Sequence, residues 1–264
     1  ASFNYKMSEG LKITFLGTGT SMGVPVIGCD CLTCSSNDPH DKRLRTSILI
    51  EQGEIKVVVD CGPDFRAQML AAKVRSLSAI VFTHEHKDHT AGLDDVRAYN
   101  FIQNKPVQIW ASKGVENALR HDYHYAFAEK RYPGVPEIVF NRIGSDEFSI
   151  GGLTITPLPV MHHKLQVYGF KIGGFVYITD ANSIPKSTWS QIKNADVLVL
   201  NALRKTEHIS HFTLEEALGI GLETGAKKLY LTHLSHQMGR HEDVEQELPE
   251  FAHLAFDGLE LYLD

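Results

Sequence analysis

Several features that often identify a protein class are scarce in this sequence. Only 4 cysteines occur among 264 residues, and three of them crowd into residues 29–34. Such clustering disfavours a framework of disulfide bonds, and a metal clip in a reducing compartment fits better. No run of about 18 apolar residues occurs, and residues 1–6 lack the apolar core of a signal peptide. We therefore expect a cytoplasmic protein without a membrane partner.

An excess of positive charge is also lacking. The chain carries 26 lysine and arginine residues against 32 acidic residues, for a formal net charge of −6. This balance argues against a broad electrostatic grip on nucleic acid, so nucleic acid is not an expected partner. A small anionic ligand remains compatible with it. The turn Gly17-Thr18-Gly19 lacks the lysine and the spacing of a phosphate-binding P-loop.

What the sequence does have is a regular succession of short apolar runs. Hydrophobic residues make up 43% of the chain, which is enough for a large core. Glycine turns between these runs predict hairpins, and Thr213 with Glu216 forms a capping box that predicts a helix start. We expect a flexible segment over residues 1–10 and one α/β domain over residues 11–264 with outer helices. Further helices are predicted at residues 65–72, 92–99 and 114–131.

The densest chemistry lies in residues 83–89, whose sequence is THEHKDH. Three imidazoles and two carboxylates fall within these seven residues, directly after the apolar run of residues 79–82. That run predicts a buried strand, so the loop after it presents several metal-capable side chains together. Imidazole nitrogen and carboxylate oxygen suit zinc, manganese or iron.

Three further apolar runs end in residues of the same kind. Residues 153–160 lead to His162, residues 175–179 lead to Asp180, and residues 229–232 lead to His233. The ends of strands in an α/β sandwich share one edge of the sheets, so side chains far apart in sequence can converge there. Four such endings in one chain predict a metal site at that edge.

This pattern resembles the metallo-β-lactamase fold superfamily from about residue 11 to the C-terminus, and the turn Asp60-Cys61-Gly62 resembles its Asp-x-Gly turn. The resemblance implies an αββα sandwich, with two mixed β-sheets flanked by helices and a two-metal site at one edge. It also implies the ligands. One metal would be held by His84, His86 and His162, and the other by Asp88, His89 and His233, with Asp180 bridging them.

Narrower motifs are similar to those of the PhnP-type phosphodiesterases of the carbon–phosphorus lyase pathway. They are residues 16–19 (LGTG), 28–34 (GCDCLTC), 158–165 (LPVMHHKL) and 231–237 (LTHLSHQ). The resemblance implies a separate structural zinc held by Cys29, Cys31, Cys34 and His236, which is a common closed ligand set. Cys61 competes with His236 for the fourth position. We favour His236, because Cys61 lies in the turn beside the predicted catalytic edge.

Two adjacent divalent cations can lower the pKa of a shared water, and the resulting hydroxide could attack a phosphodiester. The leaving alkoxide needs a proton donor that titrates near the working pH, which suits histidine. The related phosphodiesterases have a catalytic histidine just before the capped helix, and that position matches His211, with His208 as the alternative. Asp88 is a further catalytic candidate. Candidate substrate contacts are His211, His163 and Lys164.

One carboxylate is expected to orient a metal-binding imidazole, because such imidazoles usually donate their free N–H to an acceptor. Asp60 is the better candidate, since its turn should lie beside the histidine loop. Glu85 is expected to point to solvent or to the loop backbone.

The leading hypothesis is a metal-dependent phosphodiesterase that acts on a small cyclic phosphate. By resemblance, its substrate would be 5-phosphoribosyl 1,2-cyclic phosphate, and its assembly a homodimer. The alternatives are a tRNA 3′-processing endonuclease, a lactone or thioester hydrolase, and a non-catalytic metal-binding scaffold. The ligand types leave zinc, manganese and iron open for the active site.

Overall fold

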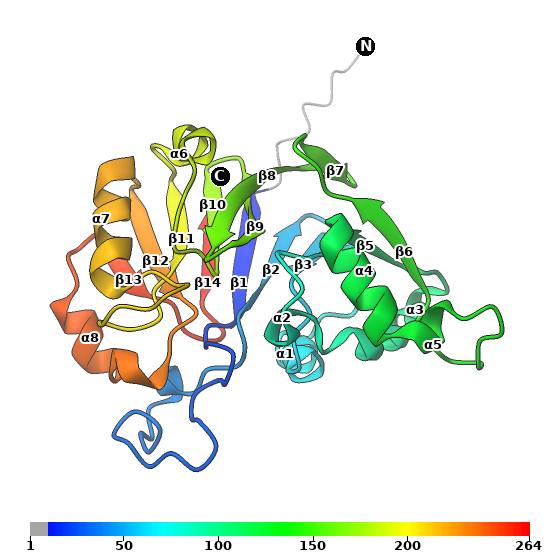
Figure 1. Ribbon diagram of the computed structural model, residues 1–264, viewed down its shortest axis with the longest axis horizontal. Coiled ribbons are helices and arrows are strands. Elements are labelled where there is room, and N and C mark those ends of the chain that lie inside the picture. Colours follow the sequence, from blue (N-terminus) through cyan, green and yellow to red (C-terminus); the bar gives the residue numbers. More distant parts are fainter. Residues whose placement is uncertain (1–9) are drawn as a thin grey trace.

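The computed structural model describes residues 10–264, so the predicted flexible segment lies outside the described residues except for Gly10. Two seven-stranded sheets pack face to face, and helices cover the outer face of each sheet (Figure 1). The predicted αββα sandwich of two mixed sheets is thereby confirmed. Within the described range, no helix has the length and apolar character needed to cross a membrane.

The first sheet combines the N-terminal half of the chain with its last strand. Strands β1, β2 and β3 form an antiparallel meander, and β3 to β6 run parallel to one another. In spatial order the strands are β14 (Glu260–Leu263), β1 (Leu11–Gly17), β2 (Ser47–Gln52), β3 (Ile55–Val59), β4 (Ala79–Val81), β5 (Val107–Ala111) and β6 (Ile138–Arg142).

The second sheet contains the remaining strands. Strands β7 to β10 are joined by hairpins, and β10 to β13 run parallel to one another. In spatial order the strands are β13 (Ala252–Leu254), β12 (Lys228–Thr232), β11 (Val197–Asn201), β10 (Phe175–Ile178), β9 (Leu165–Ile172), β8 (Leu153–His162) and β7 (Phe148–Ile150).

Helices form the two outer layers. The first sheet is covered by α1 (Phe65–Ala71), α2 (Lys87–Thr90), α3 (Arg97–Gln103), α4 (Lys113–Asp122) and α5 (His124–Phe127). The second sheet is covered by α6 (Lys186–Ile192), α7 (Leu214–Thr224) and α8 (His241–Glu247). Short 3-10 turns are η1 (Pro39–Asp41), η2 (Leu93–Val96) and η3 (His236–Met238). The core accordingly has three parts, one between the sheets and one beneath each helical layer.

Two helix predictions need correction. The segment 114–131 is not one helix: α4 ends at Asp122, Tyr123 has non-helical angles, and α5 ends where Ala128 turns to extended backbone. The segment 92–99 starts as the 3-10 turn η2, and α3 then continues to Gln103, where left-handed Asn104 ends it. The capping box of Thr213 and Glu216 is confirmed at the start of α7.

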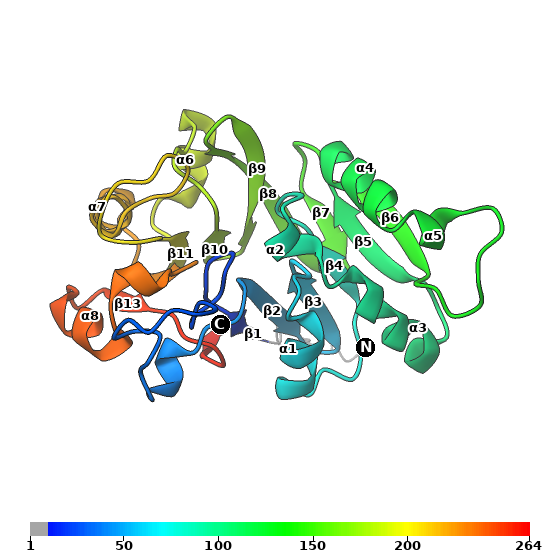
Figure 2. The same ribbon diagram turned by 60° about the horizontal axis from the view of Figure 1, so that its bottom comes forward.

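The arrangement of parallel strands decides where the polar loops meet. Strands β3 and β4 in one sheet, and β10 to β12 in the other, end at the same edge of the sandwich. Figure 2 brings this edge forward, and α2 lies on it. The residues that follow these strands therefore face one another across the sandwich.

Candidate metal centre

Seven side chains predicted to bind metal come together at this edge. The ligand atoms of His84, His86 and His162 all lie within 4.8 Å of one another. A second group within the same limit contains Asp88, His89, Asp180 and His233. Asp180 also lies 3.8 Å from His84, between Oδ2 and Nε2, so the carboxylate stands between the two groups.

Tight turns deliver these side chains directly from the strand ends. Asp60, Asp180 and His233 all have left-handed backbone, with φ of 65°, 58° and 57°. Non-glycine residues in this region are uncommon, and they concentrate at functional sites where the surrounding structure holds them. Gly62 is required beside Asp60, because a Cβ there would lie 2.1 Å from the Asp88 carbonyl oxygen. The Asp60 turn thus packs directly against the histidine loop.

The hydrogen bonds of His162 and His89 leave one nitrogen of each of these two rings free to bind a cation. His162 Nδ1 donates to the Ser210 carbonyl oxygen at 2.9 Å, so its Nε2 carries the lone pair. His89 Nδ1 donates to Asp60 Oδ2 at 2.7 Å, and its buried Nε2 has no hydrogen-bond partner. Neither ring nitrogen of buried His233 has one. Unpaired buried nitrogens beside a carboxylate are what a divalent cation would satisfy, so the residues fit a metal.

Charge is concentrated in this site. Burial alone would raise the pKa of Asp180, yet His233 and His89 hold that pKa well below its usual range. Burial disfavours the charged form of His233, but Asp180 and Asp88 outweigh it and raise the pKa of His233 to about 9. Because imidazole must lose its proton to bind a cation, metal affinity should fall as the pH is lowered.

Asp60 orients the site from behind. It is fully buried, and besides His89 it accepts hydrogen bonds from the backbone N–H and the hydroxyl of Thr83, both at 2.8 Å. The Thr83 hydroxyl, having donated to Asp60, is left to accept from His84 Nδ1 at 2.9 Å. One carboxylate therefore fixes two ligand rings, directly and through Thr83, and half-buried Glu85 has no comparable bond to a ligand ring.

We expect Asp60→Asn to weaken metal binding by roughly 10- to 100-fold. The carboxylate of Asp60 accepts hydrogen bonds from Thr83 and His89 with both of its oxygens, whereas the amide of asparagine has only one acceptor oxygen. The measurement is a titration of metal-free protein against a chelator of known affinity. Glu85→Gln, on the same edge, is the matched control and should bind metal as the unaltered protein does. Equal affinity in both variants would remove Asp60 from this role.

The two histidines proposed for proton transfer lie beside the ligands. His211 is buried, and its Nε2 lies 3.3 Å from Asp180 Oδ2. Half-buried His208 lies on the other side of His211, with 3.2 Å between their Nδ1 atoms. Burial lowers the pKa of His211 to about 4, although Asp180 opposes this. His211 also forms a third potential ligand group, with His162 and Asp180.

The predicted substrate contacts His163 and Lys164 form the exposed turn between β8 and β9. The His163 N–H donates to Asn182 Oδ1 at 2.8 Å, and Asn182 Nδ2 donates to the Ile209 carbonyl oxygen at 3.0 Å. Asn182 therefore ties this turn to the loop that carries His208 and His211. Sequence reasoning missed Asn182, because a single amide after a strand carries no distinctive signal.

A second cluster lies away from the first. His236 Nδ1 lies 3.3 Å from Cys29 Sγ, 3.4 Å from Cys31 Sγ and 3.6 Å from Cys34 Sγ. All three thiols are free, and Cys61 is buried elsewhere, beside the histidine loop. Hydrogen bonds, first from the Cys34 N–H and second with His236, lower the pKa of Cys31 to about 6. The lower pKa favours the thiolate, which is the form that binds metal. The geometry thus unites the predicted set with His236 rather than Cys61.

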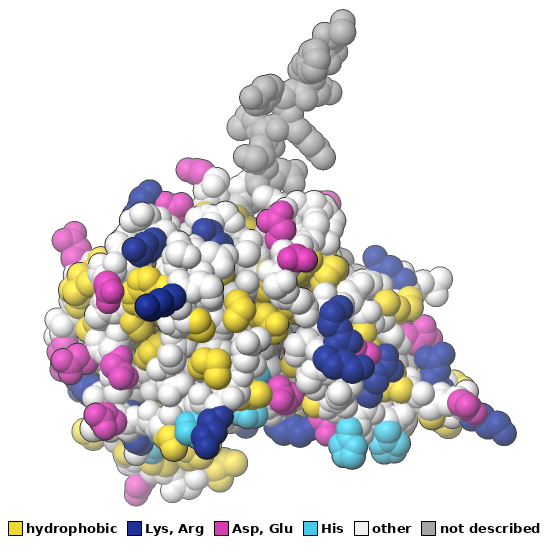
Figure 3. Space-filling model, turned by 45° about the horizontal axis from the view of Figure 1, so that its top comes forward, with side chains coloured by type: hydrophobic (Ala, Val, Ile, Leu, Met, Phe, Trp, Pro, Cys, Tyr) yellow, Lys and Arg dark blue, Asp and Glu magenta, His cyan; other side chains and the backbone are white. Residues whose placement is uncertain are grey.

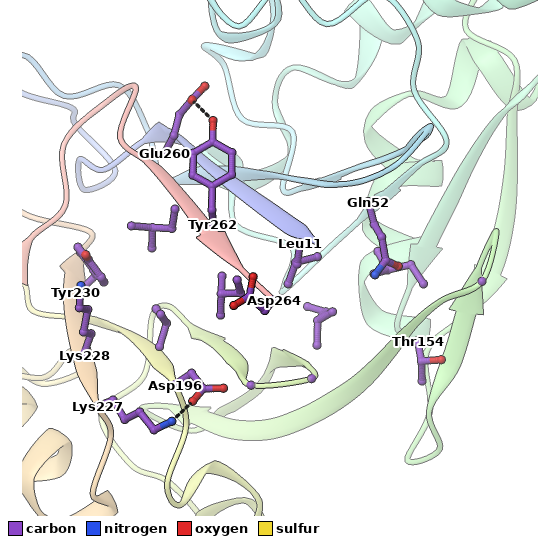
Figure 4. A pocket seen from close by; sticks show the side chains of 18 residues that line it. Leu11, Gln52, Thr154, Asp196, Lys227, Lys228, Tyr230, Glu260, Tyr262 and Asp264 are labelled. Carbon is purple, nitrogen blue, oxygen red and sulfur yellow. Dashed lines mark hydrogen bonds and ion pairs between the residues drawn. The ribbon is translucent and has the colours of Figure 1, made fainter. Parts of the chain in front are cut away.

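A cavity of about 890 Å³ lies at the opposite edge of the sandwich. It is lined by the starts of β8, β11 and β12 and by β14 (Figure 4). Its rim carries an ion pair of Lys227 with Asp196 and a hydrogen bond from Tyr262 to Glu260. None of the predicted metal ligands lines this cavity, so it is separate from the candidate metal centre.

Comparison with known proteins gives one match to a family model and several to individual proteins. Residues 56–234 match the model described as a beta-lactamase superfamily domain. A crystal structure described as a new diphosphatase from the PhnP family is similar, with a TM-score of 0.92 and 38% sequence identity, covering 97% of this chain and 98% of that one.

Two curated relatives extend the comparison. An octanoyltransferase of Porphyromonas gingivalis is 39% identical over an alignment of 258 residues that covers 96% of this chain and 52% of that protein. The chain thus spans about half the length of this relative. A ribonuclease Z of Mycobacterium bovis is 26% identical over 265 residues, covering 87% of this chain and 88% of that protein.

Proposed function

Because this chain belongs to the beta-lactamase superfamily, and to the PhnP family within it, we propose that it is a metal-dependent phosphodiesterase. The proposed substrate is a small phosphodiester such as 5-phosphoribosyl 1,2-cyclic phosphate. The observation that carries the proposal is the meeting of two ligand groups around Asp180, with buried imidazole nitrogens that lack any other partner. Similarity to a PhnP-family diphosphatase supports chemistry at phosphorus.

The donor set fits two divalent cations. One would be held by His84, His86 and His162, the other by Asp88, His89 and His233, with Asp180 shared. When bound, such a pair supplies a nucleophile from water at neutral pH and neutralises the charge on phosphate oxygens. Zinc, manganese and iron all suit these ligands. We assign the set of Cys29, Cys31, Cys34 and His236 to a separate structural zinc, because it is closed and leaves no position for substrate.

His211 moves the proton. Burial lowers the pKa of His211 to about 4, so the ring is neutral near pH 7, and its Nε2 lies 3.3 Å from Asp180 Oδ2. In the hydrolysis, a P–O bond forms to the water oxygen while the P–O bond to the leaving alkoxide breaks. His211 gives a proton to the alkoxide oxygen and is reprotonated with the proton that the water loses, so the ring ends as it began.

His211→Ala should lower kcat by about 10²- to 10⁴-fold on a diester with an alkoxide leaving group, because proton transfer of this kind contributes that much. Metal content, measured by elemental analysis, should stay intact. His121→Ala, on the exposed face of α4, is the matched control and should retain full activity. Unchanged activity would remove His211 from the mechanism, and loss of a metal would make it a ligand with His162 and Asp180.

A tRNA 3′-processing endonuclease is the second candidate, because ribonuclease Z relatives align over most of their length. The net charge of −6 weighs against it. On the face in Figure 3, acidic and basic side chains are interspersed apart from one group of lysines and arginines on the right. Octanoyl transfer receives no support from the match, which covers only about half of that relative.

Parallel assays on the metal-loaded protein distinguish these functions. We expect hydrolysis of bis(p-nitrophenyl) phosphate and of a ribose cyclic phosphate, with weak or no processing of precursor tRNA. Efficient tRNA processing would favour the second candidate. Cleavage of lactones or thioesters without diesterase activity would favour that class of hydrolase. Failure to hydrolyse any of these substrates at full metal content would point to a scaffold.

A further inference from the structure

The loop of residues 204–213, between β11 and α7, is closed at its base. The Leu203 N–H donates to the Phe212 carbonyl oxygen at 3.0 Å. The Leu214 N–H donates to the Arg204 carbonyl oxygen, also at 3.0 Å. Compact loops whose ends adjoin in this way frequently carry functional side chains, and this one carries both histidines that lie beside the metal ligands.

The inner side of this loop is held by the candidate metal centre. The Ser210 carbonyl oxygen accepts from His162 at 2.9 Å, and the Ile209 carbonyl oxygen accepts from Asn182 at 3.0 Å. These bonds reach the backbone only at residues 209 and 210. The backbone that leads to His208 therefore depends on support from the outer side.

Arg204 provides that support. Its half-buried guanidinium donates from Nε to the Thr206 carbonyl oxygen at 3.3 Å and from Nη2 to the Glu207 carbonyl oxygen at 2.7 Å. His208 follows directly, and its ring packs against that of His211, with 5.1 Å between the ring centroids. One planar side chain thus fixes the backbone immediately before the ring that flanks His211.

The remaining bond of this guanidinium leaves the loop and reaches the cysteine cluster. Arg204 Nη1 donates to Gln237 Oε1 at 2.9 Å. On the other side of His236, Ser235 donates to the Leu203 carbonyl oxygen from its N–H at 3.0 Å and from its hydroxyl at 2.8 Å. The cluster ligand His236 is therefore flanked by two residues that both bind the base of the loop.

We propose that Arg204 is a positioning residue which, with Gln237, makes the placement of His211 depend on the cysteine cluster. A cation in the cluster fixes His236, and the bonds of its two neighbours transmit that constraint to the loop. The inference rests on the proposed phosphodiesterase function, in which His211 transfers the proton. It gives a closed cation site, which has no position for substrate, an effect on the reaction.

Kinetics of the metal-loaded protein test the positioning role. Arg204→Ala should lower kcat roughly 10- to 100-fold on a ribose cyclic phosphate, because a displacement of about 1 Å can cost that much. KM should stay within about twofold. Arg204→Lys should not restore kcat, because one ammonium replaces three nitrogens that face separate acceptors. Lys205→Ala is the matched control and should keep full activity, since it removes only an exposed ion pair with Glu247.

Dependence on the leaving group separates this role from general damage. The p-nitrophenolate ion leaves without a proton, so Arg204→Ala should hydrolyse bis(p-nitrophenyl) phosphate within about threefold of the unaltered enzyme. Gln237→Leu removes one hydrogen bond and should show the same selective loss at about 3- to 10-fold. Gln237→Glu still accepts from Arg204 and should show none. An equal loss on both substrates, or equal losses in the two Gln237 variants, would overturn the proposal.

Hydrogen exchange followed by mass spectrometry is independent of activity. Zinc is released from the cluster with an organomercurial, in a Cys61→Ala protein so that the reagent meets only the cluster thiols. Exchange in peptides from the 204–213 loop should then rise by roughly tenfold. The rise should be smaller when Gln237→Leu is added, because only the Ser235 bonds then remain. Peptides from α4, which covers the other sheet, should not change.

Loop exchange that does not respond to zinc release would refute the dependence on the cluster. If the protein hydrolyses no phosphodiester but loop exchange responds as expected, the proposed function fails while the coupling of the loop to the cluster stands.

Discussion

Asp180→Ala should abolish measurable turnover, with kcat/KM lower by at least about 10³-fold. Divalent cations at such a site supply several kcal/mol of transition-state stabilisation, which would be lost with the carboxylate that holds them, and each 1.36 kcal/mol is a factor of ten. The structure singles out Asp180, because its oxygens lie 3.3 Å from His89 Nε2 and 3.2 Å from His233 Nε2. Among the residues that the structure describes, it is also the one carboxylate that belongs to two of the potential ligand groups, one with Asp88, His89 and His233 and the other with His162 and His211.

Metal analysis gives this prediction a second readout. The variant should retain the zinc of the cysteine cluster and lose at least one of the other cations. Asp180→Asn keeps the shape of the side chain and should lose the same cation. This second variant distinguishes loss of a ligand from a folding defect. Asp146→Ala, at an exposed loop position, is the matched control. Normal metal content and turnover in Asp180→Ala would contradict the assignment of a shared ligand.

Cys31→Ala should cost the protein one zinc ion and much of its thermal stability. The cluster joins the loop of residues 29–34 to His236, which lies three residues beyond the ligand His233. Loss of a structural metal belongs to the class of changes that destabilise by about 4 kcal/mol. For a protein of this size that corresponds to a fall in Tm of about 8–16 °C, measurable by calorimetry.

Cys61→Ala is the matched control for that experiment, because Cys61 is buried but lies outside the cluster. It should keep all its metal and lose only the small free energy of a deleted thiol. A Cys31→Ala protein that keeps its zinc content and its Tm would contradict the assignment of a structural zinc to this cluster. Loss of the zinc in Cys61→Ala instead would restore Cys61 as the competing fourth ligand.

The parts of this protein that could be predicted from the sequence are those with a local chemical signature. The loop of residues 83–89 repeats histidine beside aspartate after an apolar run. His162, Asp180 and His233 likewise follow apolar runs that predict strands, so they could be identified as further candidate ligands. Parallel strands that end at one edge then bring the groups together. The alternation of strands and helices predicted one α/β domain with outer helices, and the resemblance to the metallo-β-lactamase fold superfamily implied the αββα sandwich that the structure has.

What the sequence could not predict depends on backbone groups and on tertiary packing. The acceptor for His162 is the carbonyl oxygen of Ser210, and every residue has such an oxygen. Thr83 joins Asp60 to His84 only because the Asp60 turn packs against the histidine loop. The break at Tyr123 between α4 and α5 is likewise set by packing, since its hydroxyl donates to the Thr90 carbonyl oxygen.

Anomalous X-ray scattering from crystals of protein purified with ample metal, combined with elemental analysis, is the most direct test. The account predicts three cations per chain: one among Cys29, Cys31, Cys34 and His236, and two on either side of the Asp180 carboxylate. A single peak at the cysteine cluster, with the histidine and aspartate side chains around Asp180 free of any metal, would contradict it.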